Sequence, residues 1–562
     1  MLDWLSKSLG MKKKSTHPLA SAESLREILD QLPTGNGLKA LAELGDWLAM
    51  TDRPDLDPAD RIHAIRALDE RSERFSREVM FDFLSCAPTH HRAEQTWFTL
   101  TTYLGQAFDA YRHALRDLFE AGRPQERDKA TATLFAARAL HAITERKKLM
   151  RMRYRAIEPA LWSELYGAYQ TAEQLGVARK SVKVPGSAAE TSAYRELLAA
   201  LWLELAPISN LDHMQMEYLD RVVRELLTFF TVREAPDADT PFVVDLAQAS
   251  PPMRWSRDAT SRMSQRFLGP GQVYAQLVSL VRTVRRTRAL PVYLTLEGLE
   301  GVQSCVNLVE KLILHWSKNP PRRVHDRAPL QEPLEVVHGY REIRRMIAGI
   351  AYLRLTEGKT RDELSAQQRE EFSRYGFVAQ PREGQDEVEN EVDKVRAMIE
   401  AQNRQMTLEW LLTDQSEFGC GAIALGSIQW MQVGILLGLR WGGQRDWRAG
   451  VVRRLSRNAK GQATVGVQRF PGVGRCARIG ALDKRQVSVF ERSQDPGVSV
   501  YFDAIALLED RSVLVEPGVY ADNARFRLVI DGKRSTIKFL QLLERGVNFE
   551  QVRFELEPES LA

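Results

Sequence analysis

Cysteine is scarce in this chain, and long apolar runs are absent from it. The 562 residues include four cysteines, none in a C-x-x-C pair. A disulfide framework is therefore excluded, and a reducing compartment is expected. No apolar run reaches the roughly 18 residues that a membrane-spanning helix needs. We therefore expect a cytoplasmic protein without a transmembrane segment.

Charge of one sign is also lacking. Lys and Arg number 78 against 74 Asp and Glu, which gives a formal net charge of +4. So balanced a chain has no protein-wide basic field, and we expect neither DNA nor RNA as a partner. An anionic ligand would have to be held by a local cluster of basic side chains.

The common catalytic and metal-binding motifs are missing. The sequence has no G-x-x-x-x-G-K-[ST] loop, G-x-S-x-G elbow, H-E-x-x-H pair or EF-hand loop. We therefore predict that the protein is not an enzyme, that it has no catalytic residues, and that it needs neither a metal nor a cofactor.

The amino terminus carries a short amphipathic pattern. Leu2, Leu5 and Leu9 fall on one helical face, and a run of three lysines follows at 12–14. No continuous apolar stretch of a secretion signal is present. A frayed terminal helix is favoured here, and membrane-surface contact through residues 1–14 is the weaker alternative.

Helical periodicity dominates the first part of the chain. Apolar residues spaced by three and four predict a long helix near 97–118, and similar stripes recur before and after it. The stripe consists of Trp97, Leu100, Leu104, Phe108, Tyr111, Leu115 and Leu118. The sequence predicts a helical domain over 1–232, followed at 233–356 by a mixed, mostly helical region that includes short strands at 242–246 and 334–339.

The pattern then changes twice. Residues 357–404 are highly charged and predict an exposed linker or a solvated helix. From 405 onward, short apolar runs alternate with glycines, and R-F-R-L-V-I, Asp531-Gly532 and S-T-I-K-F-L-Q form a hairpin signature. We predict a closed β-barrel at 405–475 and an additional β-rich segment at 476–562. The fold class is accordingly α+β and multidomain.

One polar motif lies in the first strands of the predicted barrel. Asp414, Ser416 and Gly419 form D-x-S-x-x-G. A carboxylate and a hydroxyl two residues apart point to the same face of a strand, and a glycine lets a flat ligand approach the backbone. Alternatively, the two polar side chains only hydrogen-bond a turn at a strand end.

Residues 405–475 resemble the PilZ domain, a family of six-stranded barrels known as bacterial receptors for cyclic di-GMP. The resemblance rests on the D-x-S-x-x-G motif and on the G-x-x-L and G-x-V…G-V patterns that follow it. It implies that Asp414 and Ser416 contact guanine and that an upstream R-x-x-x-R pair grips phosphates. The window about twenty to thirty residues before Asp414 contains no such pair, so Arg396 and Arg404 are the predicted substitutes.

Two functions follow from these expectations. The first is a bacterial signalling or adaptor protein whose PilZ-like domain binds cyclic di-GMP and relays the signal to a protein partner. The alternative is a ligand-free cytoplasmic scaffold with a degenerate PilZ domain, acting only through protein–protein contacts.

Overall fold

The computed structural model describes most of the chain and divides it into two compact units. The units comprise residues 1–322 and 323–562. The described residues are 17–87, 90–120, 126–184, 189–256, 260–296, 299, 301–317, 328–356, 397, 399, 401, 404–426, 428–458, 460–482 and 501–557. Residues 1–14, for which a frayed helix is favoured over membrane contact, lie outside them, as do Arg396 and nearly all of the predicted linker.

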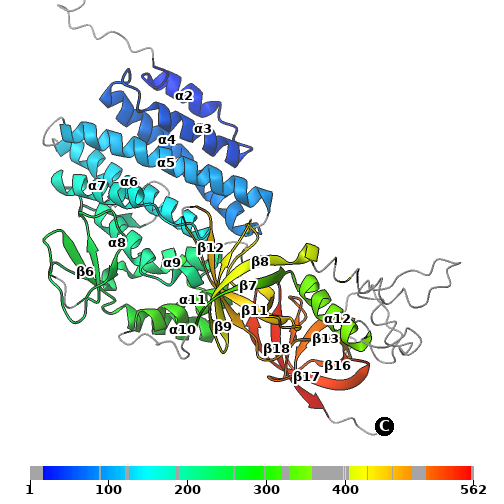
Figure 1. Cartoon of the computed structure of the whole chain (residues 1–562). Helices are drawn as coiled ribbons and strands as arrows, with labels where there is room; N and C mark the ends of the chain where they lie inside the picture. Colours follow the sequence, from blue (N-terminus) through cyan, green and yellow to red (C-terminus); the bar gives the residue numbers. More distant parts are fainter. Residues whose placement is uncertain are drawn as a thin grey trace, which may run out of the picture. The chain divides into compact units, whose positions relative to one another are not determined.

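Six helices side by side begin the first unit (Figure 1). They are α2 (Ala22–Asp30), α3 (Gly37–Met50), α4 (Pro58–Ser85), α5 (His91–Glu120), α6 (Glu126–Met152) and α7 (Pro159–Gln174). The predicted stripe lies along α5, where Leu100, Phe108 and Tyr111 are buried. Burying this face against α3, α4 and α6 supplies the hydrophobic driving force for the stack.

The rest of the first unit mixes helices with short strands. A four-stranded sheet in the order β3-β6-β4-β5 accompanies further helices, and the strand predicted at 242–246 is present as β4. The helices are α8 (Ala193–Glu204), α9 (His213–Leu226), α10 (Val273–Thr287) and α11 (Val302–His315). The strands are β1 (Val182–Lys183), β2 (Glu190–Thr191), β3 (Thr231–Arg233), β4 (Phe242–Asp245), β5 (Met253–Arg254) and β6 (Gln265–Gly269), and short 3-10 turns occupy 208–210, 227–229 and 292–294.

A buried network of charged side chains joins α6, α8 and α9. The Nζ atom of Lys148 lies 2.7 Å from Glu145, 2.9 Å from Glu217 and 2.9 Å from Asp220. The guanidinium of Arg224 lies 2.7 Å from Glu196 of α8 and 3.2 Å from Glu145. Because buried charges are costly unless they are paired, these ion pairs fix how the three helices face one another.

Lys147, the neighbour of Lys148, has a different environment. Its side chain is 4% exposed, and its Nζ atom has no hydrogen-bond acceptor within the described part of the chain. That atom lies 2.9 Å from the ring centroid of Trp162, on α7. The face of the Trp162 ring is therefore the group that the amino group of Lys147 contacts.

A closed barrel of six antiparallel strands begins the second unit. Its strands are β7 (Ala328–His338), β8 (Leu408–Ser416), β9 (Gly419–Ala424), β10 (Leu436–Trp441), β11 (Arg448–Arg457) and β12 (Ala463–Arg469). Around the ring they follow the order β7-β8-β9-β12-β11-β10, and β10 closes back onto β7. We call this the first barrel. Its β7 is the strand predicted at 334–339, and α12 (Tyr340–Thr356) follows it directly.

A second barrel follows immediately and has the same strand order. It contains β13 (Arg475–Ala481), β14 (Tyr501–Leu507), β15 (Ser512–Val515), β16 (Arg525–Ile530), β17 (Lys533–Arg545) and β18 (Glu550–Glu557). Numbered along the chain, the strands of each barrel are joined in the order 1-2-3-6-5-4. The fold class predicted from the sequence is confirmed, and the additional strands expected after the barrel form this second barrel. The finer domain limits stay predictions.

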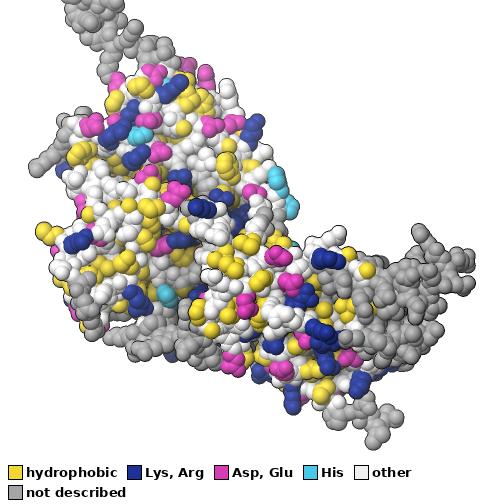
Figure 2. Space-filling model, viewed as in Figure 1, with side chains coloured by type: hydrophobic (Ala, Val, Ile, Leu, Met, Phe, Trp, Pro, Cys, Tyr) yellow, Lys and Arg dark blue, Asp and Glu magenta, His cyan; other side chains and the backbone are white. Residues whose placement is uncertain are grey.

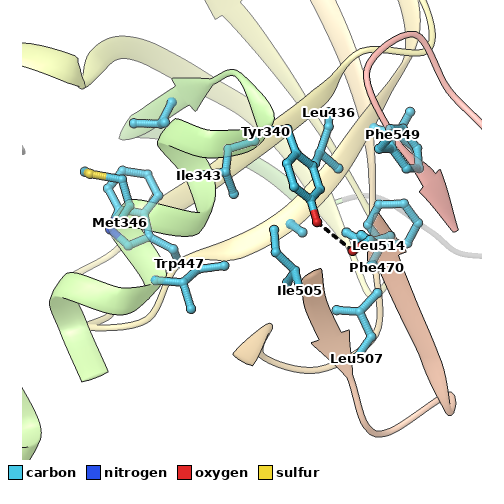
Figure 3. Packing of buried hydrophobic residues seen from close by; sticks show 14 residues of the cluster. Tyr340, Ile343, Met346, Leu436, Trp447, Phe470, Ile505, Leu507, Leu514 and Phe549 are labelled. Atoms are coloured by element: carbon cyan, nitrogen blue, oxygen red, sulfur yellow. Dashed lines mark hydrogen bonds between the residues drawn. The ribbon is translucent and has the colours of Figure 1, made fainter. Parts of the chain in front are cut away.

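Helix α12 lies between the two barrels in one shared core (Figure 3). Ile343 and Met346 of α12 are fully buried against Leu436 and Trp447 of the first barrel, and against Ile505 of the second. The hydroxyl of Tyr340 points across this core into the second barrel. The two barrels and α12 therefore share their hydrophobic stabilisation.

The surface agrees with the balanced composition. On the face of the first unit that Figure 2 shows, Lys and Arg side chains are interspersed with Asp and Glu. Within the described ranges, every helix is too short or too polar to span a lipid bilayer.

Candidate ligand-binding face of the first barrel

The D-x-S-x-x-G motif forms the hairpin between β8 and β9. Asp414 and Ser416 end β8, and Gly419 begins β9 directly opposite Ser416. The Ser416 hydroxyl donates to the carbonyl oxygen of Gly419 at 3.3 Å. The structure thus brings the three predicted residues together in one tight turn.

The Asp414 carboxylate lies on the outer face of the barrel. On β9, Cys420 and Ala422 are buried in the barrel core, so Gly421 between them faces outward. A Cβ built on Gly421 would lie 2.5 Å from Oδ2 of Asp414. Any side chain at position 421 would displace the carboxylate, and glycine therefore lets Asp414 lie flat across β9.

A β-bulge accompanies this placement. The β8–β9 register passes from Leu412–Ala422 to Asp414–Gly421, so Thr413 is an extra residue on β8. Bulges re-aim the side chains that follow them and are common beside functional sites. The bulge at Thr413 therefore contributes to the orientation of Asp414.

A second glycine extends this outer surface sideways. Gly466 of β12 pairs directly with Gly421 and lies between two buried valines, so it also faces outward. A Cβ on Gly466 would lie 3.1 Å from Nε of Arg454, on β11. One row across the strands β8, β9, β12 and β11 thus contains, in this order, Asp414, Gly421, Gly466 and Arg454. The first of these residues carries a carboxylate and the last a guanidinium.

Arg469 supports the hairpin from behind. Its Nη2 atom donates to the carbonyl oxygens of Ser416 and Glu417, the latter at 2.7 Å. Its guanidinium also lies 4.9 Å from the ring centroid of Trp441. Burial lowers the pKa of Arg469, with nearby Arg448 lowering it further. The turn is thus held by charge-assisted hydrogen bonds, which are stronger than neutral ones.

Of the two arginines predicted as phosphate ligands, one can be placed relative to this hairpin. Arg396 lies outside the described residues, and Arg404 lies just before the start of β8. Arg404 there lines a cavity of about 410 Å³ together with Glu335, Glu409 and Arg440. Glu409 and Asp414 are five residues apart on the same strand, about 16 Å at 3.3 Å per residue. Arg404 and Asp414 therefore belong to opposite ends of β8.

The barrel topology points to an arginine pair that the sequence interpretation missed. The strand beside β8 is β7, with Pro329 paired to Asp414 and Ala328 paired to Gln415. Directly before β7 the sequence reads Arg323-Val-His-Asp-Arg327, which has the R-x-x-x-R spacing. These residues lie outside the described ranges. The sequence signal for this pair is its R-x-x-x-R spacing. The pair lies directly before β7, the strand that pairs with β8, and not directly before β8 itself.

The second barrel offers a comparison for this hairpin. Its second and third strands are likewise joined across a D-x-S sequence, Asp510 and Ser512. Here Ser512 is fully buried and its hydroxyl donates to Asp510 at 2.6 Å. The Gln551 amide donates to both side chains, each at 3.1 Å. This D-x-S sequence is engaged internally, whereas Asp414 of the first barrel lies over the buried Gly421 of the neighbouring strand.

Comparison with known proteins bears on the first unit. Residues 23–237, well under half of the chain, match the domain family described as "Cyclic-di-GMP receptor FimW, N-terminal domain". The match spans helices α2 to α9 and the following strand β3. No curated protein matches the chain. The helical unit is therefore similar to the N-terminal domain of a cyclic di-GMP receptor.

Proposed function

We propose that this protein is a cyclic di-GMP receptor whose ligand binds at the β8–β9 hairpin on the outer face of the first barrel. The observation that carries the proposal is the Asp414 carboxylate, laid across Gly421 beside the Ser416 turn. A carboxylate in this position accepts hydrogen bonds from the N1 and N2 groups of guanine. The PilZ-like motif and the receptor-domain match at 23–237 support the same ligand.

The phosphates need a second set of groups. We propose Arg323 and Arg327 for this role, because their spacing fits and because they directly precede the strand that pairs with Asp414. Arginine forms bidentate pairs with phosphate oxygens and lies flat on aromatic bases. Their contribution rests on sequence spacing and on chain connectivity to Ala328.

The receptor acts on a protein partner rather than on a chemical substrate in this proposal. The first barrel shares its core with α12 and the second barrel, so a ligand at the hairpin contacts a barrel that packs directly against both. A protein partner bound elsewhere on the chain can respond to the ligand only if its affinity differs between the ligand-bound and the ligand-free state. The alternative is a ligand-free scaffold that uses these surfaces for protein contacts alone.

Isothermal titration of cyclic di-GMP into the full chain tests the proposal. We expect saturable binding that is lost or weakened more than tenfold in Asp414→Ala and in the Arg323→Ala/Arg327→Ala double variant. Asp531→Ala, in the exposed hairpin turn of the second barrel, is the matched control and should bind like the wild type. Absence of binding by the wild type at high micromolar ligand would favour the scaffold.

A further inference from the structure

Two arginines start from the inner face of the first barrel at one of its ends. Arg469 ends β12, and Arg448 begins the neighbouring strand β11. Val467 pairs with Cys420 in the barrel core, so Arg469, two residues further along β12, also faces inward. Arg469 pairs with Gly450, and Arg448 lies two residues before Gly450 on the same face of β11. We call this end, which the β8–β9 hairpin borders, the barrel mouth.

The positive charges of these two arginines are not neutralised. Arg469 is 6% exposed, and its guanidinium donates to two carbonyl oxygens of the β8–β9 hairpin, which carry only partial charges. Arg448 forms no ion pair and no side-chain hydrogen bond within the described ranges. The Glu332 carboxylate lies 3.5 Å from the Cβ position of Gly442, in the β10–β11 turn, but forms an ion pair with neither arginine.

The two charges also act on each other. Burial lowers the pKa of Arg469, and the positive charge of Arg448 lowers it further, although Cys420 opposes both effects. The two guanidinium groups are therefore close enough to repel each other. A buried cation that is not paired with an anion is costly, and a second cation beside it adds to that cost.

Unused hydrogen-bond donors occur at the same place. The Nε atoms of Arg448 and Arg469 are both buried, and neither has an acceptor in the part of the chain that the structure describes. Buried donors without an acceptor are rare in native proteins and indicate a bound water or ion. A water molecule would satisfy a donor but would leave both charges uncompensated. An anion would supply the acceptor and the charge together.

Phosphate is the anion that two guanidinium groups suit best. The planar fork of arginine donates in parallel to two phosphate oxygens, and such charge-assisted hydrogen bonds are strong. The ring of Trp441, whose centroid lies 4.9 Å from the Arg469 guanidinium, packs against that group on one side. Arg448 is partly exposed, and a Cβ on Gly443 of the adjacent turn would meet no atom within 4 Å. A ligand can therefore approach from the side of Arg448.

We propose that Arg448 and Arg469 form a phosphate-binding site at the barrel mouth. The phosphate group has two sources: a cyclic dinucleotide bound at the β8–β9 hairpin, or free phosphate. The first source rests on the function proposed above, whereas the second does not. The inference adds phosphate-binding residues outside the D-x-S-x-x-G and R-x-x-x-R motifs.

Thermal unfolding of the full chain tests the site with inorganic phosphate, in buffers matched in ionic strength with chloride. Phosphate should raise the melting temperature of the wild type, because a ligand that binds the folded state stabilises it. Arg448→Gln should lose this shift. Without phosphate it should be at least as stable as the wild type, because it removes a charge that repels Arg469. Arg553→Gln, which changes an exposed arginine of β18, is the matched control and should respond like the wild type.

Isothermal titration of cyclic di-GMP into the same three proteins distinguishes the two sources. Binding weakened tenfold or more in Arg448→Gln, with a smaller dependence on salt, would identify the dinucleotide as the source. Loss of the phosphate shift with unchanged dinucleotide affinity would identify free phosphate. Identical behaviour of Arg448→Gln and the wild type toward both ligands would overturn the inference. Failure of the wild type to bind cyclic di-GMP would reject the receptor function, and the phosphate shift would then decide the inference alone.

Discussion

The hydroxyl of Tyr340, at the start of α12, donates to the carbonyl oxygens of Leu514 at 2.7 Å and Asp503 at 3.1 Å (Figure 3). The tyrosine follows β7 of the first barrel, whereas both acceptors belong to the second barrel. Arg344, one turn further along α12, forms an ion pair with Asp503 at 2.5 Å. The first two turns of α12 therefore carry polar contacts that join the barrels.

Replacing Tyr340 with phenylalanine should destabilise the second unit. The variant keeps the ring in the shared core but leaves two carbonyl groups without this donor, which costs about 1–3 kcal/mol of unfolding free energy. Urea unfolding of the full chain measures this loss. Tyr520→Phe, which removes a surface hydrogen bond to Asp522, is the control and should have little effect. Equal stability of Tyr340→Phe and the wild type would contradict the role given to this hydroxyl.

Replacing Lys147 with methionine should stabilise the helical unit and flatten its pH dependence. Burial lowers the pKa of Lys147 to about 7, with Arg151 lowering it too and Glu204 opposing them. The unfolded chain, with an ordinary pKa of 10.5, binds one more proton between these values. The free energy of unfolding therefore rises with pH from 7 toward 10.5, by up to about 1.4 kcal/mol per pH unit.

Unfolding by urea between pH 7 and pH 9.5 checks this prediction. The stability gained by Lys147→Met should be largest at pH 7 and should shrink as pH rises. Lys39→Met alters a side chain that is 67% exposed and serves as the control. Parallel pH profiles for the wild type and Lys147→Met would show that Lys147 keeps its ordinary pKa.

Replacing Glu196 with glutamine should weaken the packing of α8 against α6 and α9. Burial raises the pKa of this carboxyl, but Arg224 at 2.7 Å and His141 at 3.2 Å outweigh burial and hold the pKa well below its usual range. Removing one partner of a buried network costs about 3–5 kcal/mol. This contribution is present above the ordinary carboxyl pKa and is lost as pH falls toward the folded value.

The difference in stability between the wild type and Glu196→Gln is therefore expected at neutral pH and should shrink in acid. Thermal unfolding followed by circular dichroism at pH 7 and at pH 3 measures both conditions. Glu120→Gln, on an exposed turn at the end of α5, is a suitable control. A stability difference that grew in acid would contradict the lowered pKa assigned to Glu196.

Replacing Gly421 with alanine should impair the proposed ligand site without unfolding the barrel. The added methyl group meets the Asp414 carboxylate, a side chain that can rotate away, rather than backbone. We expect weaker cyclic di-GMP binding with a melting temperature close to that of the wild type. Unchanged affinity would mean that the position of the carboxylate over β9 is not used by the ligand.

Local features of this fold could be predicted from the sequence. Period-3.6 stripes located α5, and Asp531-Gly532 located the β16–β17 hairpin because both residues adopt the positive φ that its turn requires. The D-x-S-x-x-G spacing located the β8–β9 turn in the same way. Each of these signals acts between residues close in sequence, where side-chain periodicity and backbone conformation decide the structure.

Pairings between distant segments could not be predicted in this way. The run at 334–339 was recognisable as a strand, but nothing in its composition indicated β8 as its neighbour across residues 339–407. The expectation of a barrel beginning at 405 therefore placed the candidate arginines upstream of β8 rather than upstream of β7. The sequence likewise could not predict the row formed by Asp414, Gly421, Gly466 and Arg454. This row depends on the registers between four strands and on two bulges.

The position of β7 has a consequence for how the chain folds. The first barrel closes only when β7 pairs with both β8 and β10, and the chain must bring its ends together across residues 339–407 before either pairing is possible. Closing so long a segment costs conformational entropy before any strand pairing can offset that cost. Such high contact order slows folding. The second barrel is interrupted only by the shorter segment between β13 and β14, so we expect it to form earlier and to serve as the surface on which the first is completed.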